Sequence, residues 1–176
     1  MYNVALGGCM DIRLFDEELN TKFKFRVNGI LIVDDKLLTL EMNNMCYRCF
    51  PGGHVMVGES TEEAIKREFY EETGIRVDEV KLMTILQNFF PGYDANYHEL
   101  SFYYIVKSNH IPEEKLKDFK LVEHDHDHIM NMDYKWLKIG DLNEIILKPD
   151  IIKDILIKRD FEFKHLINRE KDGEEL

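Results

Sequence analysis

The chain has few of the features that mark secreted or membrane-spanning proteins. Three cysteines among 176 residues are too few for the disulfide framework of a small secreted domain. The longest apolar runs, Gly29–Val33 and Phe102–Val106, have the length of strands and fall far short of the ~20 residues that a membrane helix needs. Residues 1–9 end at Cys9 in a pattern that resembles a bacterial lipoprotein cleavage site, but no basic segment precedes it. We therefore expect no signal peptide, no membrane partner and a cytoplasmic protein.

Positive charge is also in deficit. The 34 acidic side chains outnumber the 23 basic ones and give a formal net charge of −11. This sign opposes long-range attraction to duplex nucleic acid and to anionic membranes. It leaves a phosphorylated small molecule open as a partner, because a divalent cation reverses the local sign at a site.

The chain holds enough apolar residues to bury one core. Hydrophobic side chains make up 44% of it and charged ones 32%, a balance that excludes fibrous and disordered classes. The length fits one domain, and no internal repeat, low-complexity stretch or Pro/Gly/Ser-rich linker divides it.

Hydrophobic patterning predicts strands interrupted by helices. A helix is expected from Ser60 or Thr61 to about Thr73, with Gly74 suited to its C-terminal end. A second helix is expected from Pro149 toward residue 167. This order indicates an α/β fold with a mixed sheet between helices. Strands are predicted over residues 22–33, 36–41, 47–50, 76–86, 99–107 and 134–138.

One segment carries most of the functional information. Residues 53–75 read GHVMVGESTEEAIKREFYEETGI. This segment resembles the complete signature of the Nudix hydrolases. Its defining residues are Gly53, Glu59, Arg67, Glu68, Glu71, Glu72 and Gly74.

The physical chemistry of the segment supports this resemblance. Glu68, Glu71 and Glu72 are spaced so that their carboxylates crowd onto one helix face, which destabilises a helix unless a counterion is present. A hard divalent cation relieves the repulsion and prefers oxygen ligands. A solvated acidic helix face is the alternative, but it leaves the glycines and Arg67 unexplained, whereas Arg67 can pair with Glu59 or Glu71 and hold it in position.

The resemblance implies an α/β/α sandwich in which the signature forms a loop–helix–loop. It also implies hydrolysis of a nucleoside diphosphate linked to another moiety, with Mg²⁺ as cofactor and Mn²⁺ as a substitute. Glu68 and Glu72 would be the main metal ligands, assisted by Glu71 and the Gly52 carbonyl. Glu68, Glu71 and Arg67 would form the catalytic machinery, and Glu68 serves some members as general base. Gly53, Glu59 and Gly74 would shape the motif.

The resemblance sets expected boundaries along the chain. It extends over roughly residues 22–148, which would form the catalytic core. Residues 1–21 would be an extension, a short hairpin or strand against the core. Residues 149–169 would form the C-terminal helix, and residues 170–176 a polar tail.

The substrate and the class of activity are left open by the signature. A nucleoside triphosphate (an oxidised one included), a nucleotide sugar such as ADP-ribose and a dinucleoside polyphosphate all contain the required diphosphate. A rival reading is a non-catalytic sensor of the same fold that binds a nucleotide to regulate a partner. A third is a zinc protein built on Cys46, Cys49 and the His124–His128 run, although two cysteines three residues apart on a strand face opposite sides.

Residues outside the signature complete the candidate site. A general base could come from Glu99 or from the acids within residues 123–127. Arg48 is a candidate phosphate contact. Phe89, Phe90 and Tyr93, expected in a loop beside Pro91-Gly92, could stack on a base or equally pack a dimer interface or the core edge. A homodimer is possible, with Leu14 and Phe15 of the extension contributing. The His124–His128 run fits a solvated loop better than a metal site.

Overall fold

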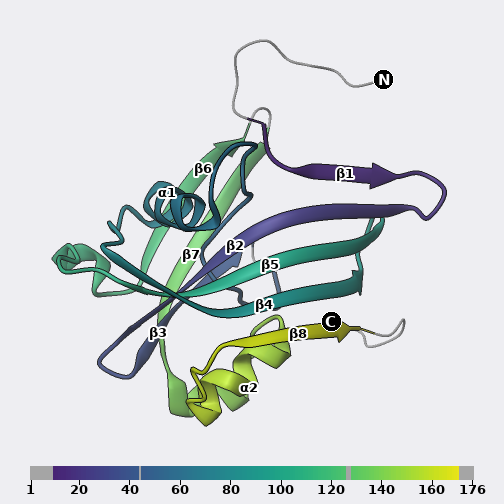
Figure 1. Cartoon of the computed structure of the whole chain (residues 1–176). Coiled ribbons are helices and arrows are strands. Elements are labelled where there is room, and N and C mark those ends of the chain that lie inside the picture. The colour runs from purple at the N-terminus through teal and green to yellow at the C-terminus, as the bar shows by residue number, and fades with distance from the viewer. Residues whose placement is uncertain (1–9, 44, 126–127, 171–176) are drawn as a thin grey trace.

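The computed structural model describes residues 10–43, 45–125 and 128–170 (Figure 1). Its strands form one mixed sheet in the order β6-β7-β3-β2-β5-β4-β8, and β1 pairs with β2 outside this path. The strands are β1 (Arg13–Asp16), β2 (Thr21–Val33), β3 (Lys36–Met42), β4 (Glu79–Pro91), β5 (Asn96–Lys107), β6 (Phe119–Asp125), β7 (His128–Lys138) and β8 (Lys164–Arg169). The helices are α1 (Thr61–Thr73) and α2 (Asp150–Lys158), with 3-10 turns at Glu113–Lys115 and Ile139–Glu144.

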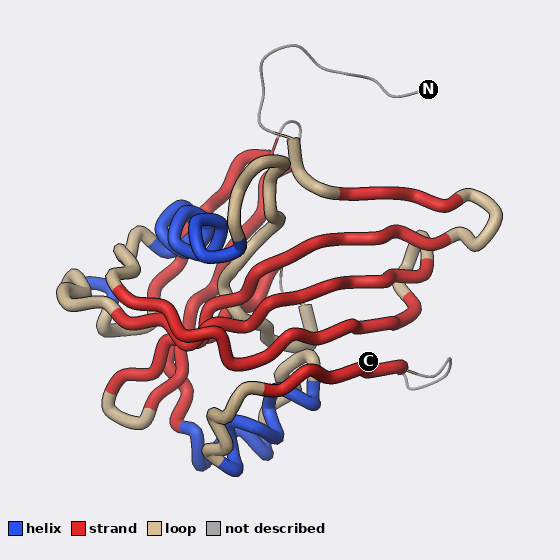
Figure 2. Tube along the Cα trace, viewed as in Figure 1, coloured by secondary structure: helices blue, strands red, loops and turns tan. Residues whose placement is uncertain are grey.

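The two helices cover opposite faces of the sheet, which confirms the predicted α/β architecture (Figure 2). Side chains alternate along β2, so that Val27 packs in one core cluster and Ile30 in another. The Val27 cluster contains Ile65 and Phe69 of α1. The Ile30 cluster contains the buried side chains of α2. Among the described residues, no helix combines the length and apolar character of a membrane span.

Helix α1 has both of its expected end signals. Ser60 is the N-cap, and its side chain forms a reciprocal capping box with Glu63. Gly74 ends the helix in the left-handed conformation, with φ 71°. The helix lies close to β2 at Gly29, since a Cβ added to this residue would be only 2.4 Å from the Phe69 ring. The glycine on β2 therefore sets how closely α1 approaches the sheet.

Residues 48–55, called the wedged segment below, lie between β2 and β3. The two strands pair with each other only near their hairpin. The amide of Val27 donates to the Gly53 carbonyl at 2.9 Å, and the amide of Gly29 donates to the Pro51 carbonyl at 2.8 Å. On the other side, Cys49 and Leu40 exchange backbone hydrogen bonds of 2.7 and 2.9 Å. The predicted strand over residues 47–50 is wrong, since only isolated bridges form there. The wedge carries the glycines to the middle of the sheet.

The C-terminal helix is shorter than predicted. It ends at Lys158, where Arg159 adopts the left-handed conformation with φ 53°. Lys164–Arg169 forms β8 instead, pairing in parallel with β4. Patterning alone gave no signal for this strand because its partner lies far away in the sequence. At the other end of the chain, β1 pairs with β2 in an antiparallel hairpin.

Candidate active site

Two glutamates of α1 reach back to the glycine turn of the wedged segment. The amide of Gly52 donates to Glu72 Oε2 at 2.8 Å. A Cβ built on Gly53 would lie 2.1 Å from Glu68 Oε2, so the absence of a side chain at residue 53 is what lets Glu68 lie there. The turn thus brings the carboxylates of Glu72 and Glu68 to neighbouring glycines.

Arg67 holds the loop before α1 against the acidic face of the helix. Its Nε and Nη2 each lie 2.8 Å from a carboxylate oxygen of Glu59. Its Nη1 lies 2.7 Å from Glu68 and 3.0 Å from Glu71, and Nη2 also donates to the His54 carbonyl at 3.1 Å. Bidentate pairing of this kind fixes orientation as well as charge. Arg67 therefore holds Glu59 and Glu71, the two partners that the sequence predicts, and it also holds Glu68, which the sequence did not predict as a partner.

The acidic residues of α1 differ in their electrostatic surroundings. Burial raises the pKa of Glu68, while Arg67 acts to lower it. The hydrogen bond from Arg67 lowers the pKa of Glu59. Glu71 is more exposed, with 57% of its side-chain surface accessible against 15% for Glu68. Glu68 therefore differs from Glu71 in being largely buried.

The donors at the glycine turn fit a hard divalent cation. Glu68, Glu72 and the Gly52 carbonyl supply only oxygen ligands, and the absence of a side chain at Gly53 lets the Glu68 carboxylate lie at the turn. Among the side chains that the structure describes, no three of His, Cys, Asp or Glu are grouped around a common point. Glu68 and Glu72, from successive turns of α1, are the carboxylates that would hold a cation here.

Arg26 is a site residue that sequence reasoning missed. It lies on β2, and its Nη2 donates to the Gly52 carbonyl at 3.1 Å. Burial lowers the pKa of neighbouring His54 to about 3, and the charge of Arg26 adds to this effect. The signal in the sequence was a charged residue in the middle of a strand that enters the core.

Glu99, one of the two candidate bases, is brought toward this site. On β5 it pairs in register with Lys24 of β2, two residues before Arg26, and so it lies on the same face as Arg26. Its charge, together with that of Glu72, acts on Arg26. The other candidates, the acids within residues 123–127, lie outside the described side chains, as does the His124–His128 run.

The aromatic residues expected to stack on a base are placed differently from the prediction. Phe89 and Phe90 belong to β4 rather than to a loop, and as neighbours on a strand they face opposite sides of the sheet. Phe89 stacks on His98 at 4.2 Å and Phe90 stacks on Tyr97 at 5.2 Å. They cannot clamp one base between them. The third, Tyr93, is fully exposed.

A cavity of about 260 Å³ lies beside these aromatic residues. Its lining includes Thr21, which is five residues from Arg26 on β2 and therefore roughly 17 Å away along the strand. The cavity is thus separate from the glycine turn. Phe89, Phe90, Arg169 and Glu170 also line it.

Arg48 has a structural position. Its side chain is 7% exposed and pairs with Glu41 at 2.9 Å. It also donates to Thr39 Oγ1 at 2.7 Å and to the Asp133 carbonyl at 2.5 Å. These bonds hold the wedged segment to β3 and β7. The placement favours this structural role over the expected phosphate contact.

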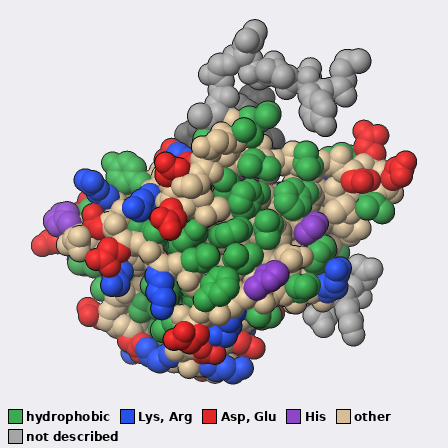
Figure 3. Space-filling view, in the orientation of Figure 1, with side chains coloured by type: hydrophobic (Ala, Val, Ile, Leu, Met, Phe, Trp, Pro, Cys, Tyr) green, Lys and Arg blue, Asp and Glu red, His purple; other side chains and the backbone are tan. Residues whose placement is uncertain are grey.

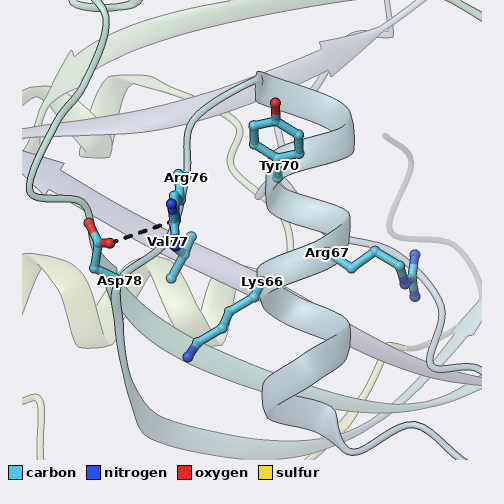
Figure 4. Close-up of a pocket in the computed structure, with 6 residues that line it drawn as sticks. All are labelled: Lys66, Arg67, Tyr70, Arg76, Val77 and Asp78. Atoms are coloured by element: carbon cyan, nitrogen blue, oxygen red, sulfur yellow. Dashed lines mark ion pairs between the residues drawn. The ribbon is translucent and has the colours of Figure 1, made fainter.

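A second cavity, of about 590 Å³, lies beside α1 and the loop that follows it (Figure 4). Lys66 and Arg67 leave the helix on opposite sides, with Lys66 toward the loop that carries Arg76 and Asp78. The Arg67 guanidinium is thereby directed away from that loop and is committed to the acidic face of the helix. The residues that line this cavity are Lys66, Arg67, Tyr70, Arg76, Val77 and Asp78.

Cys46 and Cys49, which precede the glycine turn, should differ sharply in the reactivity of their thiols. Cys46 is exposed, whereas burial raises the pKa of Cys49 to about 12. Only the thiolate reacts with iodoacetamide. We expect Cys46 to be alkylated at pH 8 at least about tenfold faster than Cys49, as measured by peptide mass spectrometry, with both labelled in urea. Equal labelling of the folded protein would contradict this placement.

Comparisons with known proteins agree with the fold and the signature. The Nudix domain model matches residues 23–156. An ADP-ribose pyrophosphatase of Methanocaldococcus jannaschii is 36% identical over 83 residues, which are 46% of this chain and 48% of that protein. The alignment thus spans about half the length of that curated relative.

Solved structures share the same architecture at low sequence identity. The MutT mutator protein of Bacillus halodurans superposes with a TM-score of 0.58 and 20% identity, covering 86% of this chain and 93% of that one. A Nudix hydrolase of Nitrosomonas europaea gives a TM-score of 0.54 and 20% identity, covering 80% and 91%. With the family model matching most of the chain and the signature assembled at the glycine turn, the protein belongs to the Nudix family.

Proposed function

We propose that the protein is a divalent-cation-dependent hydrolase of a diphosphate bond in a nucleoside diphosphate derivative. The observation that carries the proposal is the convergence of Glu68 and Glu72 on the Gly52–Gly53 turn. Arg67 orients this arrangement through its bonds to Glu59 and Glu68. The curated relative's name, ADP-ribose pyrophosphatase, supports the same class of reaction.

The chain's own residues have distinct roles in this reaction. Glu68 accepts a proton from the attacking water. Arg67 keeps the Glu68 carboxylate in position, and Glu72 is anchored by the Gly52 amide. When bound, Mg²⁺, or Mn²⁺ in its place, supplies charge neutralisation on phosphate oxygens and acidifies water. Glu71, exposed on the same face, would complete the set of oxygen ligands.

The substrate belongs to one of three classes that share the diphosphate. These are nucleoside triphosphates, nucleotide sugars such as ADP-ribose, and dinucleoside polyphosphates. The test is phosphate-product release across a panel of all three, with Mg²⁺, with Mn²⁺ and with chelator. Cation-dependent cleavage of one class supports the proposal and identifies the substrate. Nucleotide binding without any cleavage would overturn it in favour of a sensor that regulates a partner.

Glu99 is the second candidate for the general base. It shares a sheet face with Arg26, whereas Glu79, at 65% exposure, forms an ion pair with Lys107. We expect Glu99→Gln to lower kcat by about 10²-fold if Glu99 takes the proton, with Glu79→Gln as the matched control. If Glu99→Gln and Glu123→Gln both leave kcat and its pH profile unchanged, the general base is expected within helix α1.

We also propose a cytoplasmic homodimer that acts on a small nucleotide, without duplex nucleic acid or membrane as partner. Two side chains of β1, Leu14 and Phe15, are 63% and 53% exposed. Hydrophobic side chains gather on the sheet face shown in Figure 3, over β2, β5 and β4. Burying this surface between two copies would remove it from water. Light scattering should give twice the monomer mass, and a monomer at working concentration would contradict the proposal.

A further inference from the structure

Arg26 shares a backbone carbonyl with the expected cation site. Its Nη2 lies 3.1 Å from the Gly52 carbonyl oxygen, which the Nudix signature predicts as a metal ligand. Its Nε is buried and has no hydrogen-bond partner within the described part of the chain. A buried guanidinium N–H without an acceptor is costly. The unpaired Nε therefore indicates that a bound ligand supplies its hydrogen-bond acceptor.

The surroundings of Arg26 are built for a positive charge and a polar ligand. Burial acts to lower the pKa of Arg26, but the charges of Glu99 and Glu72 outweigh it and raise that pKa. Ser101 is the register partner of Arg26 on β5 and is 1% exposed. Its Oγ also lacks a partner among the described residues. Two unsatisfied polar atoms thus lie at paired positions on one sheet face.

A divalent cation at the Gly52 carbonyl would compete with the Arg26 guanidinium for this place. Both favour the Gly52 carbonyl and the field of Glu72, and their like charges repel at such short range. Binding of a cation to the carbonyl therefore weakens the Arg26–Gly52 hydrogen bond. The released Nη2 and the free Nε form one edge of the guanidinium, a fork that matches two oxygens of a phosphate.

We propose that Arg26 is a positioning residue that holds the Gly52 carbonyl until a divalent cation binds and then presents its Nε–Nη2 edge to a phosphate of the substrate. The inference rests on the proposed function. It adds that the Arg26 guanidinium exchanges the Gly52 carbonyl for a phosphate as its hydrogen-bond acceptor when a cation binds.

The experiment measures two affinities in three variants. Mn²⁺ affinity without nucleotide is measured by calorimetry, and the affinity for α,β-methylene-ADP is measured with saturating Mg²⁺. Arg26→Met should bind Mn²⁺ about fivefold tighter or more, because a competing charge is gone. It should bind the analogue about tenfold weaker or more, because a charged hydrogen bond is lost. Arg76→Met, at a side chain 85% exposed, removes the same charge and should change neither affinity.

Arg26→Lys separates charge from fork geometry. It should leave Mn²⁺ affinity near that of the wild type and still weaken the analogue, since lysine has no planar pair of donors. Unchanged or weaker Mn²⁺ binding by Arg26→Met would overturn the inference. If the wild type binds no Mn²⁺ at all, the proposed function fails with it; if only the change in Arg26→Met is missing, the inference fails alone.

A measurement on the wild type covers the case in which Arg26→Met does not fold. The Arg26 Nε resonance in ¹⁵N-arginine-labelled protein is identified by its loss in Arg26→Lys. Mg²⁺ alone should shift this resonance, and α,β-methylene-ADP should shift it again as a phosphate oxygen is engaged. A resonance that does not respond to Mg²⁺ would contradict the exchange.

Discussion

Glu72→Gln should lower kcat by about 10²–10³-fold or more while leaving the fold intact. The variant removes the negative charge that would face the cation. Its amide oxygen can still accept the 2.8 Å hydrogen bond from the Gly52 amide, so the glycine turn keeps its anchor. Glu68→Gln should behave alike, because it removes both a ligand charge and the proton acceptor. Steady-state kinetics of each variant measure the loss of kcat, and urea unfolding measures whether the fold is intact.

The matched control lies on the same helix. Glu62 is exposed in the first turn of α1, and Glu62→Gln changes the net charge by the same amount. It should keep near wild-type kcat. Near wild-type turnover in Glu72→Gln would show that the assignment of the cation site is wrong, whereas a collapse of stability would show that the charge serves the fold.

Alanine at the two glycines of the turn should separate folding from activity. Gly52 has φ +149°, and a Cβ there would lie 2.1 Å from the Val27 carbonyl oxygen, which is fixed in β2. Gly52→Ala should therefore lower the free energy of unfolding by about 3 kcal/mol. At Gly53 the Cβ would meet the Glu68 carboxylate, the far end of a flexible side chain. Gly53→Ala should keep most of the stability and lose about 10²-fold in kcat, because Glu68 is displaced.

Gly140→Ala is the control for both variants. Apart from its chain neighbours and the backbone of its own helical turn, no heavy atom of the described residues lies within 4 Å of a Cβ placed on Gly140. The variant should change neither stability nor activity. Urea unfolding and steady-state kinetics on the three variants give the result. A Gly53→Ala enzyme with full activity would contradict the position of Glu68 against the turn.

The local part of the site could be predicted from the sequence because its determinants are close together in the chain. Ser60, Glu63 and Gly74 define the ends of α1 through bonds within a few residues. Glu68 and Glu72 lie on one face of that helix by its periodicity. Their convergence on Gly52 follows once the helix lies beside the glycine turn.

The missed elements depend on pairing between distant segments. β8 exists because Lys164–Arg169 completes the edge of β4, which no local pattern announces. Phe89 and Phe90 were expected in a loop because Pro91 and Gly92 follow them, yet pairing with β5 extends β4 to Pro91. Arg26 could not be placed because its partner, the Gly52 carbonyl, reaches β2 only through the wedged segment.

The wedged segment ties the chemistry to the cooperative unfolding of the whole sheet. The Gly53 and Pro51 carbonyls accept hydrogen bonds from Val27 and Gly29 of β2, and the amide of Val55 donates to the Phe25 carbonyl at 3.0 Å. The turn that carries the ligands cannot open alone without breaking these bonds. Hydrolytic competence should therefore persist up to the main denaturation transition and vanish with it, and the amide protons of Val27 and Gly29 should exchange with solvent only through global opening.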